Sequence, residues 1–207
     1  LNTSIDRPLN NRALTGVYPP GSTFKPFMAL AALELGKRTP QQAISDPGHF
    51  DFGGRRFRDD KVGGHGMVDM YKSIVQSCDT YYYTLARDMG VDLISEQMKP
   101  LGFGQITGID ILGESRGVLP STEWKRTTYK RAEQQRWYSG ETISLGIGQG
   151  YNSYTMLQIA QATSTLANNG LKMKPHLVRE VLDVETKAST PVAKEPVEQL
   201  PLLPENI

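Results

Sequence analysis

Residues Tyr18 to Gly36 read YPPGSTFKPFMALAALELG and place a serine and a lysine three residues apart at the start of an apolar segment. Two prolines and a glycine stop any preceding element, and Gly36 suits a helix C-cap. The apolar residues recur at the spacing of one buried helical face: Phe24, Phe27, Met28, Ala31, Ala32 and Leu35. The stretch therefore predicts a buried helix, with Pro26 tolerated in its first turn.

Ser22 and Lys25 would lie on the same face of this helix, one turn apart. At the helix start, unpaired N–H groups and the positive end of the helix dipole favour an anion developing on Ser22. Burial disfavours the charged form of an amine, so Lys25 could accept a proton from Ser22. The pair predicts a nucleophile with its base, although a serine at a helix start is more often only a cap.

Composition sets broad limits on the function. The chain has 207 residues, of which 38% are hydrophobic, which suffices for one large domain or two small ones. Its 23 basic and 22 acidic side chains leave a net charge of +1, so charge gives no reason to expect nucleic acid as a partner. The single cysteine, Cys78, excludes an internal disulfide. The stretch LNTSIDRPLNNRALTG at the start is not typical of a natural N-terminus, so we expect any targeting segment to lie outside this chain.

The rest of the chain is predicted to be rich in helices. Residues 37–66 are dense in Gly, Pro, Asp and Arg and indicate a structured loop or hairpin region, and residues 104–142 are expected to be mostly loop. The elements expected are a small ribbon at His49 to Phe52, helices at 67–76 and Thr80 to Met89, a short helix stopped near Pro100, a helix from a Ser153 cap to Asn169, and a strand at Leu177 to Val184.

The break between the two central helices reads Ser77-Cys78-Asp79. A hydroxyl and a carboxylate on this turn could face Ser22 and complete a proton path. Serine and aspartate are ordinary turn residues, so this motif alone is weak. Following a Ser-x-x-Lys, however, such a motif is typical of penicillin-recognising enzymes.

Three stretches, NRALTGVYPPGSTFKP, SCDTYYYTLARDMG and SLGIGQGYNSYTMLQIAQATSTLANNG, resemble the transpeptidase domain of class B penicillin-binding proteins over most of Asn11 to Pro175. The Ser-x-Asp form resembles the elongation-specific penicillin-binding protein 2 of Gram-negative bacteria. The resemblance implies an α/β penicillin-recognising transpeptidase fold, of which this chain would be mainly the helical part, with the central sheet incomplete. Residues 1–187 would form a partial transpeptidase domain, and the Pro- and Glu-rich residues 188–207 an extended or disordered tail.

The resemblance also implies roles for the motif residues. Ser22 would attack the carbonyl between the last two D-alanines of a peptidoglycan stem peptide, with Lys25 as general base. Ser77 would relay the proton to the leaving amine, and Asp79 would hold the loop and Lys25 in place. A neighbouring stem peptide would then take the acyl group, whereas a β-lactam would remain attached.

The family further implies a protein at the periplasmic face of the bacterial inner membrane, working with a SEDS-family glycosyltransferase and other elongation-complex proteins. Two alternatives stay open: a β-lactamase or D,D-carboxypeptidase that passes the acyl group to water, and a non-catalytic β-lactam sensor. The family's third motif, Lys-Thr-Gly, is not found. The only Lys-x-Gly, Lys61-Val62-Gly63, precedes Ser77 instead of following it, so we predict that this segment alone is inactive or nearly so.

A metal site is a further hypothesis. Asp46, Asp59, His65 and Cys78 offer an oxygen, oxygen, nitrogen and sulfur set that suits tetrahedral zinc, but their irregular spacing favours an inert buried cysteine. The resemblance implies a structural zinc held by two Asp, one His and one Cys in this region. Asp60 competes with Asp59, and His49 with His65. The predicted chemistry needs no cofactor.

Two last segments carry weaker signals. Residues 123–141, EWKRTTYKRAEQQRWYSGE, are rich in basic and aromatic residues and favour a solvated loop with aromatic anchors over a groove for an acidic polymer. The glycine-rich stretch GIGQGY, Gly146 to Tyr151, lacks the spacing of a nucleotide loop. It predicts close backbone packing at the edge of the cleft, with Tyr151 as an anchor.

Overall fold

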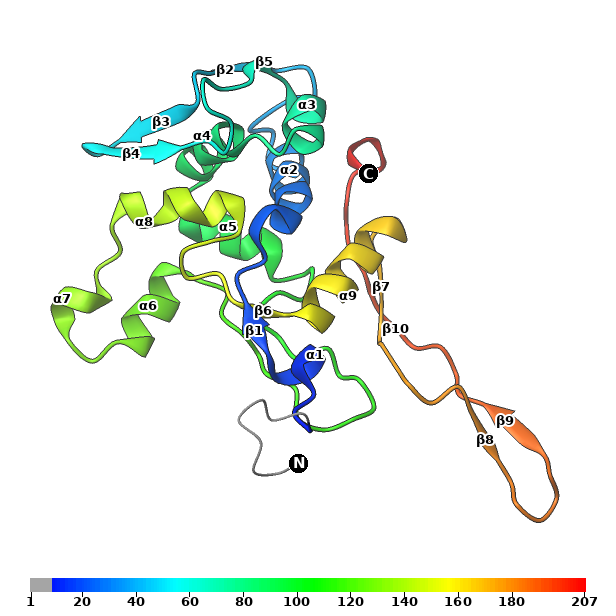
Figure 1. Ribbon diagram of the computed structural model, residues 1–207. Helices are drawn as coiled ribbons and strands as arrows, with labels where there is room; N and C mark the ends of the chain where they lie inside the picture. The colour runs from blue at the N-terminus through cyan, green and yellow to red at the C-terminus, as the bar shows by residue number, and fades with distance from the viewer. Residues whose placement is uncertain (1–8) are drawn as a thin grey trace.

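The stretch that begins with the Ser-x-x-Lys motif forms a short 3-10 helix, η1 (Gly21–Phe24), that continues directly into helix α2 (Lys25–Glu34). In this computed structural model, which describes residues 9–207, α2 lies among the other helices (Figure 1). Gly36 adopts a left-handed φ of 60° just after the last turn, as the C-cap prediction required. The predicted buried face is confirmed at Phe24, Phe27 and Met28, each at most 2% exposed.

Aromatic rings fill the core beside η1 and α2. The ring of Phe103 lies 5.3 Å from that of Phe24 and 5.1 Å from that of Phe27, both edge-on, and 4.7 Å from that of Tyr154. Rings packed in this way stabilise the fold through the apolar surface that they bury and through their favourable edge-to-face geometry. The start of α2 is therefore held rigidly from the side of the core.

The predicted break between two helices near Ser77 is confirmed. Helix α3 (Met70–Val75) begins at Asp69, whose side chain accepts a hydrogen bond from the Lys72 N–H, and helix α4 (Asp79–Met89) follows after three residues. Helix α5 (Val91–Met98) continues after Gly90 and ends close to Pro100, as predicted.

Between α2 and α3 the chain forms two antiparallel strand pairs: β2 (Ile44–Asp46) with β5 (Gly66–Val68), and β3 (His49–Phe52) with β4 (Arg55–Arg58). The ribbon predicted at His49 to Phe52 is thus confirmed. Gly53 and Gly54 both have positive φ at the hairpin turn, which glycine adopts readily. The loops around these strands bring residues from both ends of the region beside the N-terminus of α4 (Figure 1).

Residues 104–142 are mostly loop, as predicted, but they also hold short helices that were not predicted. This stretch contains α6 (Thr122–Thr128), α7 (Ala132–Gln135) and the first part of α8 (Ser139–Ile143), which leads into the 3-10 helix η2 (Ser144–Ile147). The Ser121 side chain accepts from the Trp124 N–H and starts α6. These helices are too short to show an apolar period.

Helix α9 (Met156–Ala167) is capped by Thr155 and not, as predicted, by Ser153. Thr155 and Gln158 form a reciprocal capping box, because each side chain accepts from the other's backbone N–H. Ser153 instead pairs with Val118 in an isolated bridge. Near the N-terminal side, α1 (Arg12–Thr15) is followed by β1 (Val17–Tyr18), which pairs with β6 (Tyr154–Thr155).

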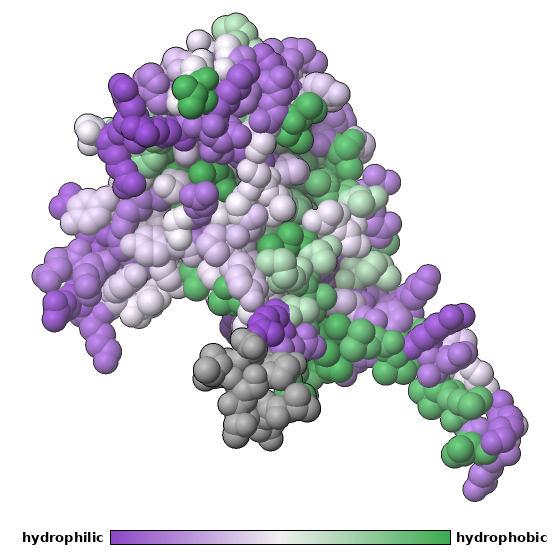
Figure 2. Space-filling view, viewed as in Figure 1, coloured by the Kyte–Doolittle hydropathy of each residue, from purple (hydrophilic) through white to green (hydrophobic). Residues whose placement is uncertain are grey.

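The C-terminal part forms a projecting arm (Figure 1). Its pairs are β7 (Leu171–Met173) with β10 (Pro196–Gln199), and β8 (Glu180–Leu182) with β9 (Ser189–Pro191). The strand expected at Leu177 to Val184 is shorter than predicted. Residues 188–207 are extended and return to the body, where Leu200 is buried and η3 (Pro204–Asn206) lies against α2. Figure 2 shows hydrophobic residues exposed along the arm.

The strands of residues 9–207 occur only as two-stranded pairs, so this part of the chain is mainly helical and holds no larger sheet. Within the same residues, no helix combines the length and apolarity needed to cross a membrane.

Candidate active site

Helix α2 and the break between α3 and α4 bring the two sequence motifs together. The Ser77 hydroxyl donates to Ser22 Oγ over 2.9 Å and accepts from Lys25 Nζ over 2.9 Å. Lys25 Nζ also contacts the Ser77 carbonyl oxygen at 2.5 Å and Asp79 Oδ1 at 2.6 Å. All four residues predicted from the motifs therefore form one connected network, in which Ser77 lies between the hydroxyl of Ser22 and the amine of Lys25.

Burial differs sharply across this network. Lys25 is 1% exposed, whereas Ser22 is exposed at the surface. Three oxygens surround Lys25 Nζ, so an ammonium formed when Lys25 takes up a proton would find an acceptor for each of its three N–H groups. Burial raises the pKa of the Asp79 carboxyl, and the hydrogen bond from Lys25 acts in the opposite direction. The site thus offers an accessible hydroxyl backed by a buried, solvent-shielded proton acceptor.

Ser77 has a left-handed backbone, with φ at 55°, which is rare for a residue other than glycine. The turn is held by hydrogen bonds from the Ser77 N–H to the Ile74 carbonyl, at 3.2 Å, and from the Cys78 N–H to the Ser73 carbonyl, at 3.0 Å. Such a conformation costs on the order of 1 kcal/mol or more and persists only where the surroundings impose it. Here it directs both the hydroxyl and the carbonyl of Ser77 at Lys25.

The stretch Gly146 to Tyr151 packs against the turn that bears Ser22. The Gly21 N–H donates to the Gly148 carbonyl over 3.1 Å. A β-carbon on Gly148 would lie only 2.8 Å from Phe24 Cβ, and φ there is 68°. The predicted close backbone packing of this stretch is confirmed, and it holds this stretch against the turn that bears Ser22.

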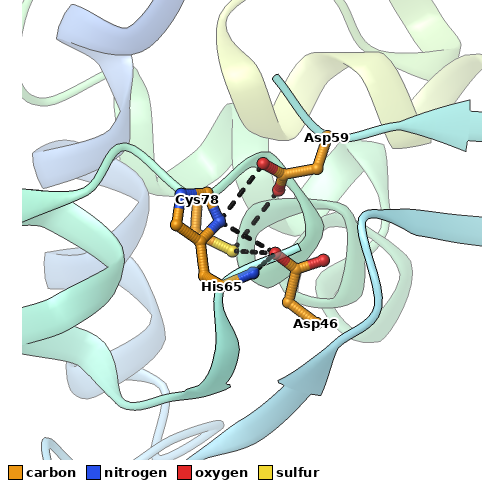
Figure 3. Close-up of side chains that lie close together, drawn as sticks. All are labelled: Asp46, Asp59, His65 and Cys78. Atoms are coloured by element: carbon orange, nitrogen blue, oxygen red, sulfur yellow. Dashed lines mark hydrogen bonds and ion pairs between the residues drawn. The ribbon is translucent and has the colours of Figure 1, made fainter. Parts of the chain in front are cut away.

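The four predicted metal ligands also meet, directly beside this network (Figure 3). Their ligand atoms all lie within 4.8 Å of one another. His65 Nδ1 is 2.8 Å from Asp46 Oδ2 and 3.3 Å from Asp59 Oδ1, and Cys78 Sγ lies 3.5 Å and 3.4 Å from the same two carboxylates. The competing residues lie outside the cluster: His49 Nε2 faces Asp51, and Asp60 is exposed.

The donor set of this cluster fits zinc. Carboxylate oxygen, imidazole nitrogen and thiolate sulfur are all zinc ligands, and four of them suit its tetrahedral preference. The side chains of Asp46 and Asp59 are fully buried, and that of His65 is 5% exposed. Two buried carboxylates at one point require a positive partner, and a metal cation would supply it.

One structural feature of this region was not predicted from the sequence. Lys125, expected in a solvated loop, has a side chain only 4% exposed, and its Nζ lies 2.6 Å from each carboxylate oxygen of Glu141. The rings of Trp137, Tyr138 and Tyr151 lie 5.4 to 5.5 Å from the same Nζ. Tyr151 also donates to Glu141, as an anchor would. In the sequence, the aromatic residues around the basic cluster were the signal that could have predicted the burial of Lys125.

Comparisons with known proteins agree with this geometry. A family model described as the penicillin binding protein transpeptidase domain matches residues 1–200. A curated relative, the peptidoglycan D,D-transpeptidase MrdA of Acinetobacter baumannii, is 50% identical over 181 residues, which is 86% of this chain and 26% of the relative. The chain thus spans about a quarter of the length of that relative.

Two solved structures are similar over nearly the whole chain. One is Pseudomonas aeruginosa PBP2 in complex with WCK 5153, with a TM-score of 0.85 and 42% identity over 100% of this chain and 46% of that chain. The other comes from a study titled "Structural coordination of polymerization and crosslinking by a peptidoglycan synthase complex", with a TM-score of 0.83 and 34% identity over 97% of this chain and 32% of that chain.

Proposed function

The chain belongs to the penicillin-binding protein transpeptidase domain family, and from this premise we propose that it carries the nucleophile of a serine D,D-transpeptidase that crosslinks peptidoglycan stem peptides. The family and the α/β penicillin-recognising fold class predicted from the sequence are confirmed. The observation that carries the proposal is the hydrogen-bonded path from exposed Ser22 through Ser77 to buried Lys25.

In the proposed reaction, Ser22 Oγ attacks the carbonyl between the last two D-alanines of a donor stem peptide. The hydroxyl proton passes to Lys25 through the Ser77 hydroxyl, which lies between them. Asp79 and the Ser77 carbonyl stabilise the ammonium formed on Lys25. The proton then returns to the leaving amine as the C–N bond breaks, which releases D-alanine and leaves an ester on Ser22. An amine of a second stem peptide attacks this ester, forms the crosslink and frees Ser22.

Two alternative functions differ from a transpeptidase in what happens to the acyl group on Ser22. A β-lactamase or D,D-carboxypeptidase passes it to water, and a β-lactam sensor retains it as a signal. The 50% identity to a named D,D-transpeptidase supports transfer to an amine. The lifetime of a penicillin adduct separates these outcomes, because rapid loss of the adduct would favour hydrolysis.

We also propose that Asp46, Asp59, His65 and Cys78 hold a structural zinc ion. When bound, zinc would supply a tetrahedral cross-link between β2, the loops around it and the start of α4, and would take no part in acyl transfer. Cys78 lies between Ser77 and Asp79 in the sequence, so fixing its sulfur would also fix the catalytic turn. The burial and mutual distances of the four ligands support this role.

The cellular setting is likewise a proposal. The family resemblance supports a place at the periplasmic face of the bacterial inner membrane, with the membrane tether outside this chain. The similar structure titled as a synthase complex of polymerization and crosslinking supports a glycosyltransferase partner, as in the SEDS family, within the elongation complex.

Intact-mass measurement after treatment with a penicillin tests the proposed chemistry. The reaction is run on this chain, on a chain extended to the length of the relatives, and on the extended chain with Ser22→Ala. We expect one adduct on the extended chain, none on Ser22→Ala, and little or none on this chain alone. An extended, folded wild-type chain without an adduct would overturn the assignment of Ser22 as the nucleophile.

A further inference from the structure

A cavity of about 400 Å³ lies between the β3–β4 hairpin and the α8–η2 region, and the proposed mechanism does not use it. Its lining residues are Arg55, Gly140, Glu141, Ser144, Gly150 and Tyr151. Figure 2 shows hydrophilic residues over the β3–β4 hairpin and over α7, with a paler zone between them. Arg55 of β4, Ser144 of η2 and Gly150 of the turn after η2 thus meet around one cavity.

The two charged groups that line this cavity are not equivalent. The Glu141 carboxylate already has hydrogen-bond partners: its two oxygens accept from Lys125 at 2.6 Å each, and they also accept from the Tyr138 N–H and from the Tyr151 hydroxyl. Its negative charge is therefore neutralised by a buried cation. Arg55 is exposed and its guanidinium lies 5.0 Å over the Phe57 ring, and no carboxylate of residues 9–207 pairs with it. Among residues 9–207, the unpaired charge that lines the cavity is therefore the positive charge of the Arg55 guanidinium.

The neighbouring residue, Arg56, provides a contrast within the same strand. Its guanidinium makes two hydrogen bonds of 2.9 Å to Asp51 across the hairpin. Successive side chains of a strand point to opposite faces, so Arg55 and Arg56 face different sides of the hairpin. Only Arg55 lines the cavity and keeps its donors available for a ligand.

The cavity lies within reach of the nucleophile. Gly150, at its edge, is two residues from Gly148, and a chain spans at most about 3.6 Å per residue. Gly148 is hydrogen-bonded to Gly21, the residue before Ser22. These steps place the edge of the cavity within roughly 18 Å of Ser22, which is about the length of an extended peptide of five residues.

We propose that this cavity is a subsite for a carboxylate of a stem peptide, with the Arg55 guanidinium as its charged partner. The inference rests on the proposed function, because stem peptides carry carboxylates on residues before the terminal D-alanines. The planar fork of an arginine matches a carboxylate with two parallel hydrogen bonds. Ser144 is a polar residue that lines the same cavity. The carboxylate belongs either to the donor peptide or to the acceptor peptide, and the two sources are separable by experiment.

The test compares Arg55→Gln with Arg56→Gln in a chain extended to the length of the relatives. The donor arm measures D-alanine release from a soluble stem peptide and from the same peptide with its internal carboxylates converted to amides. The acceptor arm measures crosslinked product with a matched pair of acceptors. We expect Arg55→Gln to lower kcat/KM by roughly fivefold to tenfold for the carboxylate form in one arm, and to leave the amide form within about twofold. Arg56→Gln is expected to behave as wild type.

Penicillin acylation of Ser22 is measured on every variant, and it separates this inference from the proposed function. A wild-type chain that fails to react with penicillin contradicts the proposed function itself. If all variants react normally with penicillin but Arg55→Gln affects carboxylate and amide peptides equally, or affects neither, the subsite is disproved. A loss confined to the donor arm or to the acceptor arm supports the subsite and identifies which peptide fills it.

Discussion

The hydroxyls of Ser22 and Ser77 lie 2.9 Å apart although 55 residues separate them in the chain. Lys25 begins the helix that directly follows Ser22, yet the hydrogen-bonded path from its amine to the Ser22 hydroxyl runs through Ser77. In the proposed reaction, Ser77 would therefore stand in the proton route and not only beside it. The left-handed φ of this residue places its hydroxyl there.

The first prediction concerns Ser77→Ala, which removes the middle of this route. We expect penicillin acylation of Ser22 to slow by about 10²-fold or more, because positioned proton transfer contributes roughly 10²- to 10⁴-fold in enzymes. Thr23→Ala is the matched control, since among residues 9–207 that hydroxyl donates to the Pro20 carbonyl alone, at 2.7 Å. Rapid acylation of a folded Ser77→Ala variant would show that Lys25 takes the proton without Ser77.

The second prediction separates the effect of steric crowding from the effect of backbone strain in the glycine-rich stretch Gly146 to Tyr151. Gly148 and Gly150 have nearly the same φ, 68° and 69°, so alanine at either costs about 1 kcal/mol or more through strain. A β-carbon would meet Phe24 Cβ at 2.8 Å from position 148 but finds no atom closer than 3.3 Å from position 150. We expect Gly148→Ala to lose more unfolding free energy and more acylation rate than Gly150→Ala. Equal effects in urea unfolding and penicillin kinetics would contradict a role for close packing against the nucleophilic turn.

The third prediction concerns the zinc proposal. Elemental analysis of the purified wild-type protein should find about one zinc per chain, and removal by a chelator should lower Tm and slow acylation, because the ligands flank the catalytic turn. His65→Ala should lose most of the metal, whereas His49→Ala, outside the cluster, should retain it. A chain that folds and acylates normally with no metal, and whose His65→Ala variant is unaltered, would exclude a structural zinc.

Local signals explain why much of this fold was predictable. The helical period after Ser22, the cap at Gly36 and the break at Ser77 each depend on residues close together in sequence. The meeting of Ser22 with Ser77 depends on a long-range contact, which the combination of the two motifs suggested and the family resemblance strengthened, but which no local pattern could establish. The same holds for the cluster of Asp46, Asp59, His65 and Cys78, whose spacing alone favoured an inert cysteine.

The errors have physical causes that are equally specific. Lys125 was placed in solvent because its neighbours are basic, but a carboxylate 16 residues away and three aromatic rings make burial of its charge acceptable. Helices α6 and α7 were missed because a helix of one or two turns shows no apolar period. The Ser121 cap was a sequence signal for α6, whereas the choice of Thr155 over Ser153 required the capping partner Gln158 to be considered.

The last prediction uses the buried pair of Lys125 and Glu141. Burial raises the pKa of the Glu141 carboxyl, but hydrogen bonds from Lys125, the Tyr138 N–H and Tyr151 outweigh burial, and the net pKa is below its usual 4.5. A carboxyl whose pKa is lower in the folded state contributes stability that is present above the unfolded value and lost as pH falls through the folded value. Between pH 7 and about 5 this contribution should be constant, and below about 4.5 it should decline. We therefore expect the unfolding free energy of the wild type to fall more steeply in acid than that of Glu141→Gln, although the variant is less stable at pH 7. Urea unfolding from pH 7 down to pH 3 measures both slopes, and parallel curves would mean that the ion pair does not couple protonation of Glu141 to folding.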